Sequence, residues 1–208
     1  MLNGRYWLLI LFMQFSHGSD DIESWNSIGF EKKLPYSLEL EFDQEIRLND
    51  EISTFKQTIS EISISREVFD GVSLFIPLRY AIFEDKVKQR LSFGASYKHG
   101  WDPIDFKFRT KLQRTYENGD FPEDLIRNKI TIEYELSKKI EPYVSGELFH
   151  LYNADRFQYN ENRISFGLNV DLPKKRSMKI FYTHKREDID SASPDLISVF
   201  GLAYDFKW

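Results

Sequence analysis

The chain has 208 residues, a formal net charge of −5 and no cysteine. This length suits one domain, the missing cysteine excludes disulfides, thiol nucleophiles and cysteine-bound metals, and the charge gives no reason to expect nucleic acid as a partner. Aromatic residues make up 16% and charged residues 29% of the chain, which suits a membrane β-barrel with aromatics at the lipid headgroups and charges in its lumen.

The first predicted element is a signal peptide over residues 1–18. Arg5 supplies a positive charge, residues 6–15 are apolar except Gln14, and Ser16 and Gly18 are the small residues that a signal peptidase reads. The alternative is a membrane anchor, but this run of about ten residues is shorter than the roughly 20 that a spanning helix needs. Residues 19–208 would then be an exported domain.

Residues 22–33 read as a strand, and a turn follows at Leu34-Pro35. After it, apolar residues alternate with polar ones, which is the period of a strand whose two faces meet different surroundings. The alternating segments fall within residues 38–47, 61–65, 72–82, 87–98, 104–116, 126–136, 143–152, 163–172, 178–185 and 200–208. A change of phase near Ser60 predicts a β-bulge, and no segment has a helical period.

These patterns predict an all-β fold, a transmembrane antiparallel up-and-down β-barrel of about 10–12 strands over residues 19–208. Counting residues 22–33 as a strand gives an odd total, whereas bacterial barrels usually have an even number. We therefore expect about ten spanning strands with 22–33 as an N-terminal extra segment, or twelve strands as the alternative.

The connections are predicted to alternate in length. Residues 137–139 and 173–176 are short turns, whereas residues 117–124, 153–161 and 187–195 are longer polar loops. Outer-membrane barrels place short turns in the periplasm and longer loops outside. Stepping through the hairpins from the last strand puts every long loop on the outer side.

Tyrosines on the apolar faces are expected to form two belts at the bilayer interfaces, where a ring is buried and its hydroxyl stays wet. The predicted belt residues are Tyr80, Tyr116, Tyr152 and Tyr182 at the outer side, and Tyr97, Tyr134 and Tyr204 at the periplasmic side.

The last segment alternates with aromatic residues on one face and stops at Trp208. It resembles the C-terminal signal strand of outer-membrane barrels, with Leu202, Tyr204, Phe206 and Trp208 as the expected assembly signal. A soluble, lipocalin-like barrel has the same period with its faces reversed. The strand number, the tyrosine belts and the dense charges of both signs favour the membrane barrel.

The order of these features resembles domain-of-unknown-function family 2490. The resemblance rests on Trp25, a short turn, the segment Leu40-Glu41-Phe42-Asp43-Gln44-Glu45-Ile46-Arg47 with its E-x-R pattern, and residues 141–149. It covers nearly all of residues 19–208. It implies an outer-membrane barrel of Gram-negative bacteria and carries no activity over to any residue.

The polar faces supply a charged network that we expect to line the lumen. Its members are Glu41, Glu45, Arg47, Arg79, Arg90, Arg109, Arg127, Glu133, Glu135, Glu147 and Arg163. Such charges could line a pore for ions or small solutes. They could also pair across a narrow barrel as a salt-bridged plug, which the small interior of about ten strands favours. We therefore expect a salt-bridged lumen with a structural or narrow-pore role, and a small-solute or ion channel as the alternative.

A barrel hydrolase is a third reading, and it needs a nucleophile with a histidine base, or an acid and a histidine. His99 is expected in a periplasmic turn, and His150 and His184 on the apolar face near the outer rim. A slip at Gly146 would turn His150 inward beside Glu147. We expect no catalytic site, no metal and no cofactor.

The surroundings follow from the predicted location in the bacterial outer membrane. Expected partners are outer-membrane lipid and lipopolysaccharide, and the barrel-assembly machinery during insertion. The acidic loop 188–195 could bind calcium or simply be solvated, since it lacks EF-hand spacing. The basic turns 138–139 and 174–176 could meet anionic lipids or be ordinary polar turns.

Overall fold

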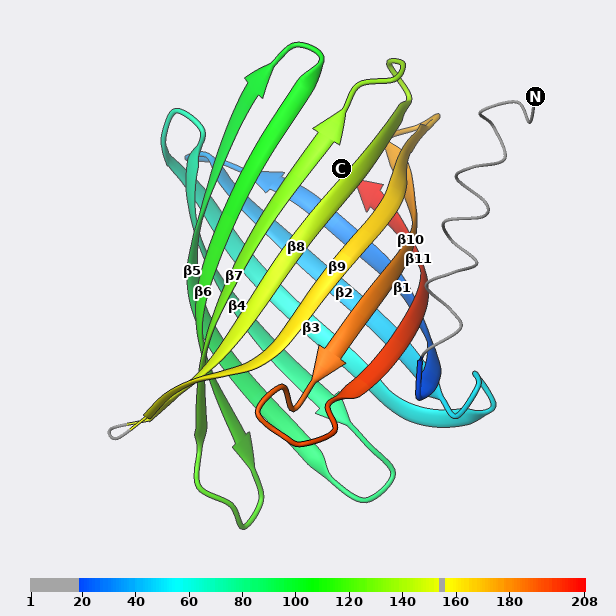
Figure 1. The fold of residues 1–208 in the computed structure, drawn as a ribbon. Coiled ribbons are helices and arrows are strands. Elements are labelled where there is room, and N and C mark those ends of the chain that lie inside the picture. Colours follow the sequence, from blue (N-terminus) through cyan, green and yellow to red (C-terminus); the bar gives the residue numbers. More distant parts are fainter. Residues whose placement is uncertain (1–18, 154–155) are drawn as a thin grey trace, which may run out of the picture.

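The computed structural model describes residues 19–153 and 156–208, so the predicted signal peptide lies outside the described residues. The described chain forms one closed barrel (Figure 1). Its strands are β1 (Asp21–Leu34), β2 (Leu38–Asn49), β3 (Thr54–Phe69), β4 (Val72–Ile82), β5 (Val87–Trp101), β6 (Ile104–Glu117), β7 (Glu123–Tyr134), β8 (Ile140–Asn153), β9 (Arg156–Leu172), β10 (Arg176–Glu187) and β11 (Asp195–Lys207). In this part of the chain, no helix is long and apolar enough to cross a membrane.

Each strand pairs antiparallel with the next, and the barrel closes by a parallel pairing of β1 with β11. The all-β barrel fold is therefore confirmed, with eleven strands in the described residues. The expectation of an even number is wrong, because residues 22–33 form most of a full strand. With an odd number of alternating strands, the first and last must run in the same direction.

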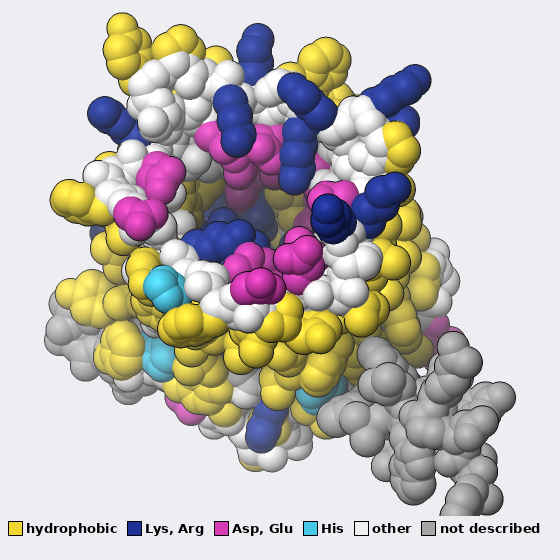
Figure 2. Space-filling model, turned by 90° about the horizontal axis from the view of Figure 1, so that it is seen from above, with side chains coloured by type: hydrophobic (Ala, Val, Ile, Leu, Met, Phe, Trp, Pro, Cys, Tyr) yellow, Lys and Arg dark blue, Asp and Glu magenta, His cyan; other side chains and the backbone are white. Residues whose placement is uncertain are grey.

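The apolar face of the alternation points outward around the barrel. Leu91 and Leu112 are more than half exposed. The interior receives the charged and small side chains instead, and Figure 2 shows acidic and basic groups around a hollow with hydrophobic side chains on the outer wall. The soluble reading, in which the apolar side chains would fill the interior, is wrong.

The predicted bulge at Ser60 does not occur, because β3 keeps its register with both neighbours through that residue. Ile59 is an apolar residue on the inner face, where the other residues of β3 are mostly polar. It therefore breaks the alternation in the sequence without any shift of register in the strand. The bulges at the two edges of β3 lie elsewhere, one between Arg47 and Leu48 and one between Glu67 and Phe69.

Connections after β2, β4, β6, β8 and β10 lie at one end of the barrel, here called the loop end, and those after β1, β3, β5, β7 and β9 at the other, the turn end. The predicted loop 187–195 is confirmed, because residues 188–194 connect β10 to β11. The predicted loop 153–161 is wrong, because Tyr159 and Phe157 pair with His150 and Tyr152 and extend the β8–β9 hairpin (Figure 1).

Three glycines on the inner wall each lie directly opposite an aromatic residue on the neighbouring strand. The pairs are Phe75 with Gly94, Tyr143 with Gly167, and Phe181 with Gly201. A Cβ atom on any of these glycines would collide with its partner ring. The rings therefore lie flat over bare backbone, which fills the inner wall without bulky side chains from both strands.

Candidate functional site: the charged lumen

Three cavities follow the lumen between the two ends. A cavity of about 360 Å³ reaches inward from the loop end, where Lys56 and Glu187 line it. A cavity of about 480 Å³ reaches inward from the turn end, where Glu67 and Gly71 line it. A third of about 220 Å³ lies along β2, β3, β4 and β6.

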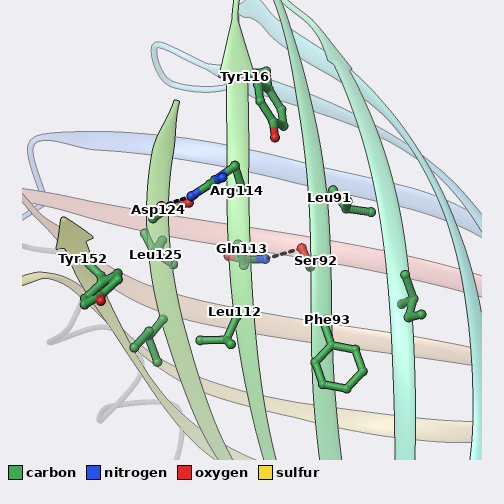
Figure 3. Close-up of a pocket in the computed structure, with 12 residues that line it drawn as sticks. Leu91, Ser92, Phe93, Leu112, Gln113, Arg114, Tyr116, Asp124, Leu125 and Tyr152 are labelled. Carbon is green, nitrogen blue, oxygen red and sulfur yellow. Dashed lines mark hydrogen bonds and ion pairs between the residues drawn. The ribbon is translucent and has the colours of Figure 1, made fainter. Parts of the chain in front are cut away.

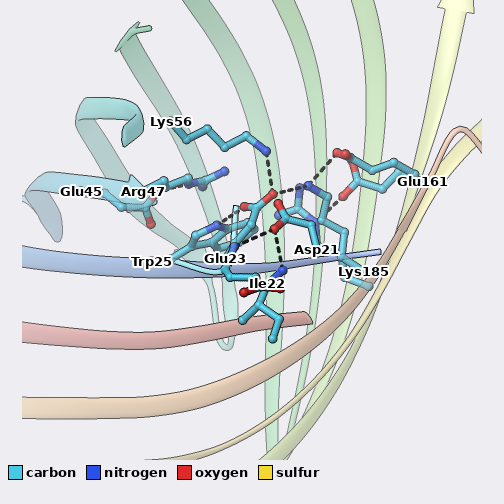
Figure 4. Close-up of polar contacts among 12 residues, drawn as sticks. Asp21, Ile22, Glu23, Trp25, Glu45, Arg47, Lys56, Glu161 and Lys185 are labelled. Atoms are coloured by element: carbon cyan, nitrogen blue, oxygen red, sulfur yellow. Dashed lines mark hydrogen bonds and ion pairs between the residues drawn. The ribbon is translucent and has the colours of Figure 1, made fainter. Parts of the chain in front are cut away.

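A buried carboxylate, Glu23 on β1, organises the loop-end wall (Figure 4). It is fully buried, accepts a hydrogen bond from the Trp25 indole at 2.6 Å, and pairs with Lys56 at 2.6 Å. Lys185 on β10 lies 3.7 Å from it and pairs with Glu187 at 2.8 Å. This network ties β1 to β3 and β10 around the closing seam.

Rings and guanidinium groups alternate across the same wall. Arg47 lies 3.7 Å from the centre of the Trp25 ring, and Arg163 lies 5.0 Å from it. Arg163 also lies 4.6 Å from the centre of Phe149, whose other neighbour is Arg127 at 4.9 Å. Such cation–π contacts hold charged groups in fixed positions against a buried apolar surface.

Most of the predicted network residues do line the lumen, and several form ion pairs. Arg47, Arg79, Arg90, Arg127 and Arg163 line the loop-end cavity. The pairs are Arg47 with Glu45 (2.6 Å), Arg79 with Glu61 (2.6 Å), Arg127 with Glu147, and Arg163 with Glu161.

The remaining predicted members lie nearer the turn end. Arg109 and Glu41 line the smallest cavity, and Glu133 lines the turn-end cavity, where it pairs with Lys107 at 2.6 Å. Glu135 does not join the network, because β7 ends at Tyr134 and leaves Glu135 exposed at the rim.

Several lumen cations lack an acidic partner. Among the described residues, no carboxylate forms an ion pair with Arg90, Arg109, Lys111, Lys129 or Lys179. Arg90 instead donates to the Thr115 hydroxyl at 2.8 Å. These cations make their own part of the lumen wall positive, while Glu39, Glu41 and Glu123, which also line the cavities, form no ion pair among the described residues.

Four of the lumen cations form a compact group, here called the cation block: Arg109 and Lys111 on β6, and Arg127 and Lys129 on β7. Arg109 lies directly opposite Lys129, and Lys111 directly opposite Arg127. Arg109 lines two cavities, and Lys111, Lys129 and Arg127 each line one of the three. The block therefore lies where the cavities approach one another.

Prediction from the sequence missed part of this site. Lys111, Lys129 and Lys179 share the alternation that places Arg109 and Arg127 in the lumen, so the same strand period also predicts their position. Glu23 and Lys185 come together only when β1 closes against β11, and no local pattern reports that closure.

The three histidines of the described residues all lie on strands. His150 lies on the outer face, stacked on Phe157 with ring centres 4.7 Å apart, and β8 has no slip at Gly146. His99 lies within β5 rather than in a turn, with its ring 4.5 Å from that of Trp101. His184 lies on β10 opposite Ser198.

Five of the predicted belt tyrosines are exposed on the outer face: Tyr80, Tyr97, Tyr116, Tyr134 and Tyr152. Tyr204 is half-buried, with its ring 5.0 Å from Phe206. Tyr182 differs, because only 5% of it is exposed and its hydroxyl shares a hydrogen bond with Ser198 at 3.0 Å.

The outer wall also has a shallow apolar groove of about 550 Å³ across β5, β6 and β7 (Figure 3). Leu91, Phe93 and Leu112 form its floor, and an Arg114–Asp124 ion pair of 2.6 Å closes one end. Because these apolar side chains belong to the outward face, the groove is separate from the lumen.

Acidic groups gather at the turn-end rim. At the turn end, Asp102, Asp105, Glu133, Glu135 and Glu141 line a cavity of about 310 Å³. Across residues 19–153 and 156–208, no group of three or more acidic, histidine or cysteine side chains could hold a metal ion.

At the loop end, Lys86 between β4 and β5 pairs with Glu117 at 3.0 Å. The hydrogen bond that Lys86 donates to Glu117, together with the negative charge of that carboxylate, raises the pKa of Lys86 above its ordinary value.

Comparison with known proteins places this geometry in context. A family model described as a protein of unknown function (DUF2490) matches residues 22–194. The NanC porin superposes with a TM-score of 0.55 at 10% identity, over 86% of this chain and 93% of that chain. A bacterial polysaccharide outer membrane secretin superposes with a TM-score of 0.52 at 7% identity, over 78% of this chain and 73% of that chain. At these identities the likeness shows the fold alone, and none of the curated proteins matches.

Proposed function

The chain belongs to the DUF2490 family of proteins of unknown function, and from that premise and its cation-rich lumen we propose that it is an outer-membrane barrel with a narrow pore for small anions. The apolar outer wall and the exposed tyrosines support the membrane location. The fold that it shares with the NanC porin is consistent with this location. Lipid and lipopolysaccharide would surround the barrel, and the proposal includes no catalytic step.

The observation that carries the pore is the row of lumen cations without acidic partners. Cavities enter from both ends and approach one another at the cation block. A channel lined by uncompensated lysine and arginine attracts anions and repels cations, since charged side chains set ion selectivity in pores.

A salt-bridged plug is the second candidate, and a specific observation favours it. Arg79, Arg127 and Phe149 line the loop-end cavity, and the two arginines are bound to Glu61 and Glu147. Barrels that hold an open water-filled channel usually have about 16 strands. In this reading the charges stabilise the barrel and little passes through it.

The experiment that separates the candidates is conductance of the purified full chain in planar bilayers under a potassium chloride gradient. We expect small single-channel steps and a reversal potential of the sign that chloride selectivity gives. Lys129→Met should lower the anion preference, whereas Lys98→Met, at a lysine paired with Asp105 at 2.8 Å near the rim, should change it less. Silence at all voltages would support the plug, and cation selectivity would overturn the proposal.

A further inference from the structure

The cation block places like charges in direct opposition. Arg109 faces Lys129 and Lys111 faces Arg127 on adjacent antiparallel strands, all on the inner wall. Like charges at opposed positions of a sheet destabilise it. Only Arg127 has a carboxylate bound to it. The Nε and one terminal nitrogen of Arg127 donate hydrogen bonds to Glu147. The other three positive charges lack a bound counter-charge among the described residues.

Lys111 makes the imbalance acute because it is almost fully buried. Only 6% of the residue is exposed, and no acceptor for its ammonium group is found among the described residues. A lysine held this deeply without a bound carboxylate is costly, and its ammonium stays open to the third cavity. The carboxylates that line the same cavity are Glu39, Glu41 and Glu61, and Glu61 is already bound to Arg79.

The turn-end cavity beside the block is lined by several hydrogen-bond donors and by two carboxylates, Glu67 and Glu133, of which Glu133 is paired with Lys107. Lys179 on β10 lines the turn-end cavity together with Arg109 and Lys129, and its ammonium lies 4.3 Å from the centre of the Tyr143 ring. The hydroxyl groups of Ser96 and Thr131 line the same cavity. This arrangement presents charged and neutral donors to one volume of about 480 Å³.

From this arrangement we infer that Arg109 and Lys129 of the cation block, together with Lys179, form a binding site in the turn-end cavity for a small multivalent anion, bearing phosphate or several carboxylates. Charge-assisted hydrogen bonds from arginine and lysine suit the several acceptor oxygens of such groups. A monovalent ion would offset one of these positive charges, whereas a multivalent anion can offset several at once. This site rests on the proposed pore function and adds to it the class of solute and the position in the lumen where that solute binds.

The test is isothermal titration calorimetry on the refolded full chain in neutral detergent at low salt. Inorganic phosphate and citrate are titrated separately, and the one that binds identifies the phosphate or carboxylate source. We expect saturable binding of one anion, weakened by about tenfold or more in Lys129→Met, because a charge-assisted bond is lost. Lys88→Met, at a loop-end lysine paired with Glu117 at 2.8 Å, should bind as the native chain does.

A second measurement guards against variants that fold poorly. Phosphate or citrate should raise the thermal unfolding midpoint of the native barrel, because a ligand that binds only the folded state stabilises it. This rise should shrink in Arg109→Gln and persist in Lys88→Met. Absence of binding to both anions, or equal binding by the block variants and the control, would overturn the site.

The two proposals fail in different ways. A barrel that binds phosphate in detergent yet stays silent in bilayers would refute the pore and keep the site. A barrel that conducts chloride yet binds neither anion would keep the pore and refute the site.

Discussion

At the scale of single residues, the inner wall depends on where side chains are missing. Phe75, Tyr143 and Phe181 can lie against the wall only because the residue opposite each is glycine. At Gly94 an added Cβ would lie 2.6 Å from the Thr110 carbonyl oxygen and 2.7 Å from Phe75 Cε2. The ring can turn away, but the carbonyl belongs to the β6 backbone and cannot move as easily.

We therefore predict that Gly94→Ala destabilises the barrel by about 1–3 kcal/mol, the usual cost of overpacking. Gly146 is the matched control, because a Cβ there meets nothing within 4 Å. Gly146→Ala should leave stability unchanged or raise it slightly, since alanine loses less backbone freedom on folding. Urea unfolding of both variants in detergent measures the difference, and equal midpoints would contradict the prediction.

For single residues, the sequence predicted which face of a strand a charge occupies but not which partner it binds. Alternation was enough to place Arg47, Arg79 and Arg163 in the lumen, because a strand's period assigns each residue a face. It could not tell which charge would find a partner. Glu61 joins Arg79 across a strand pair, whereas Arg109 has no such neighbour, and that difference depends on register between strands.

At the scale of the strand, neighbouring residues meet opposite environments. Ile130 on β7 faces outward and is exposed, lying opposite Phe108 and Gly146, whereas Thr131 lines the turn-end cavity. The same substitution at these adjacent positions therefore separates a lipid-facing wall from a polar lumen.

We predict that Ile130→Arg costs up to about 2–4 kcal/mol in lipid, because a charge then faces the bilayer near its middle. Thr131→Arg should cost much less, since lumen substitutions mainly tune selectivity. The measurement is the free energy of unfolding in phospholipid vesicles. Equal losses at the two positions would mean that the outer face does not contact lipid.

The strands themselves were largely predictable, and the failures have physical causes. Ile59 on the inner face imitated a bulge, and the polar run beyond Tyr152 hid a hairpin extension in which Phe157 and Tyr159 continue the ladder. A period identifies strands whose faces differ clearly. It loses them where an apolar residue faces the lumen or where a hairpin extends into polar sequence.

At the scale of the whole molecule, the orientation of the barrel is open to a direct test. The loop of residues 188–194 and the connection of residues 135–139 lie at opposite ends. The chain has no cysteine of its own, so an introduced thiol reports its position without background.

We predict that Ser191→Cys reacts with a membrane-impermeant maleimide on intact cells, and that Lys138→Cys reacts only after the outer membrane is opened. Longer loops face outward in outer-membrane barrels, which is the reason for this orientation. The reverse labelling would mean that the barrel has the opposite orientation in the membrane. If neither thiol is labelled in intact cells, the result would contradict the outer-membrane location.

The eleven-strand count has a consequence for how the chain could be rearranged. Because β1 and β11 run parallel, β1 begins at the loop end and β11 finishes at the turn end. A tight turn can join antiparallel neighbours, but parallel neighbours need a crossover of about a dozen residues or more. Circular permutation across this seam would require a linker along the full barrel height. Affinity tags placed before β1 and after β11 would likewise emerge on opposite sides of a membrane that the barrel spans.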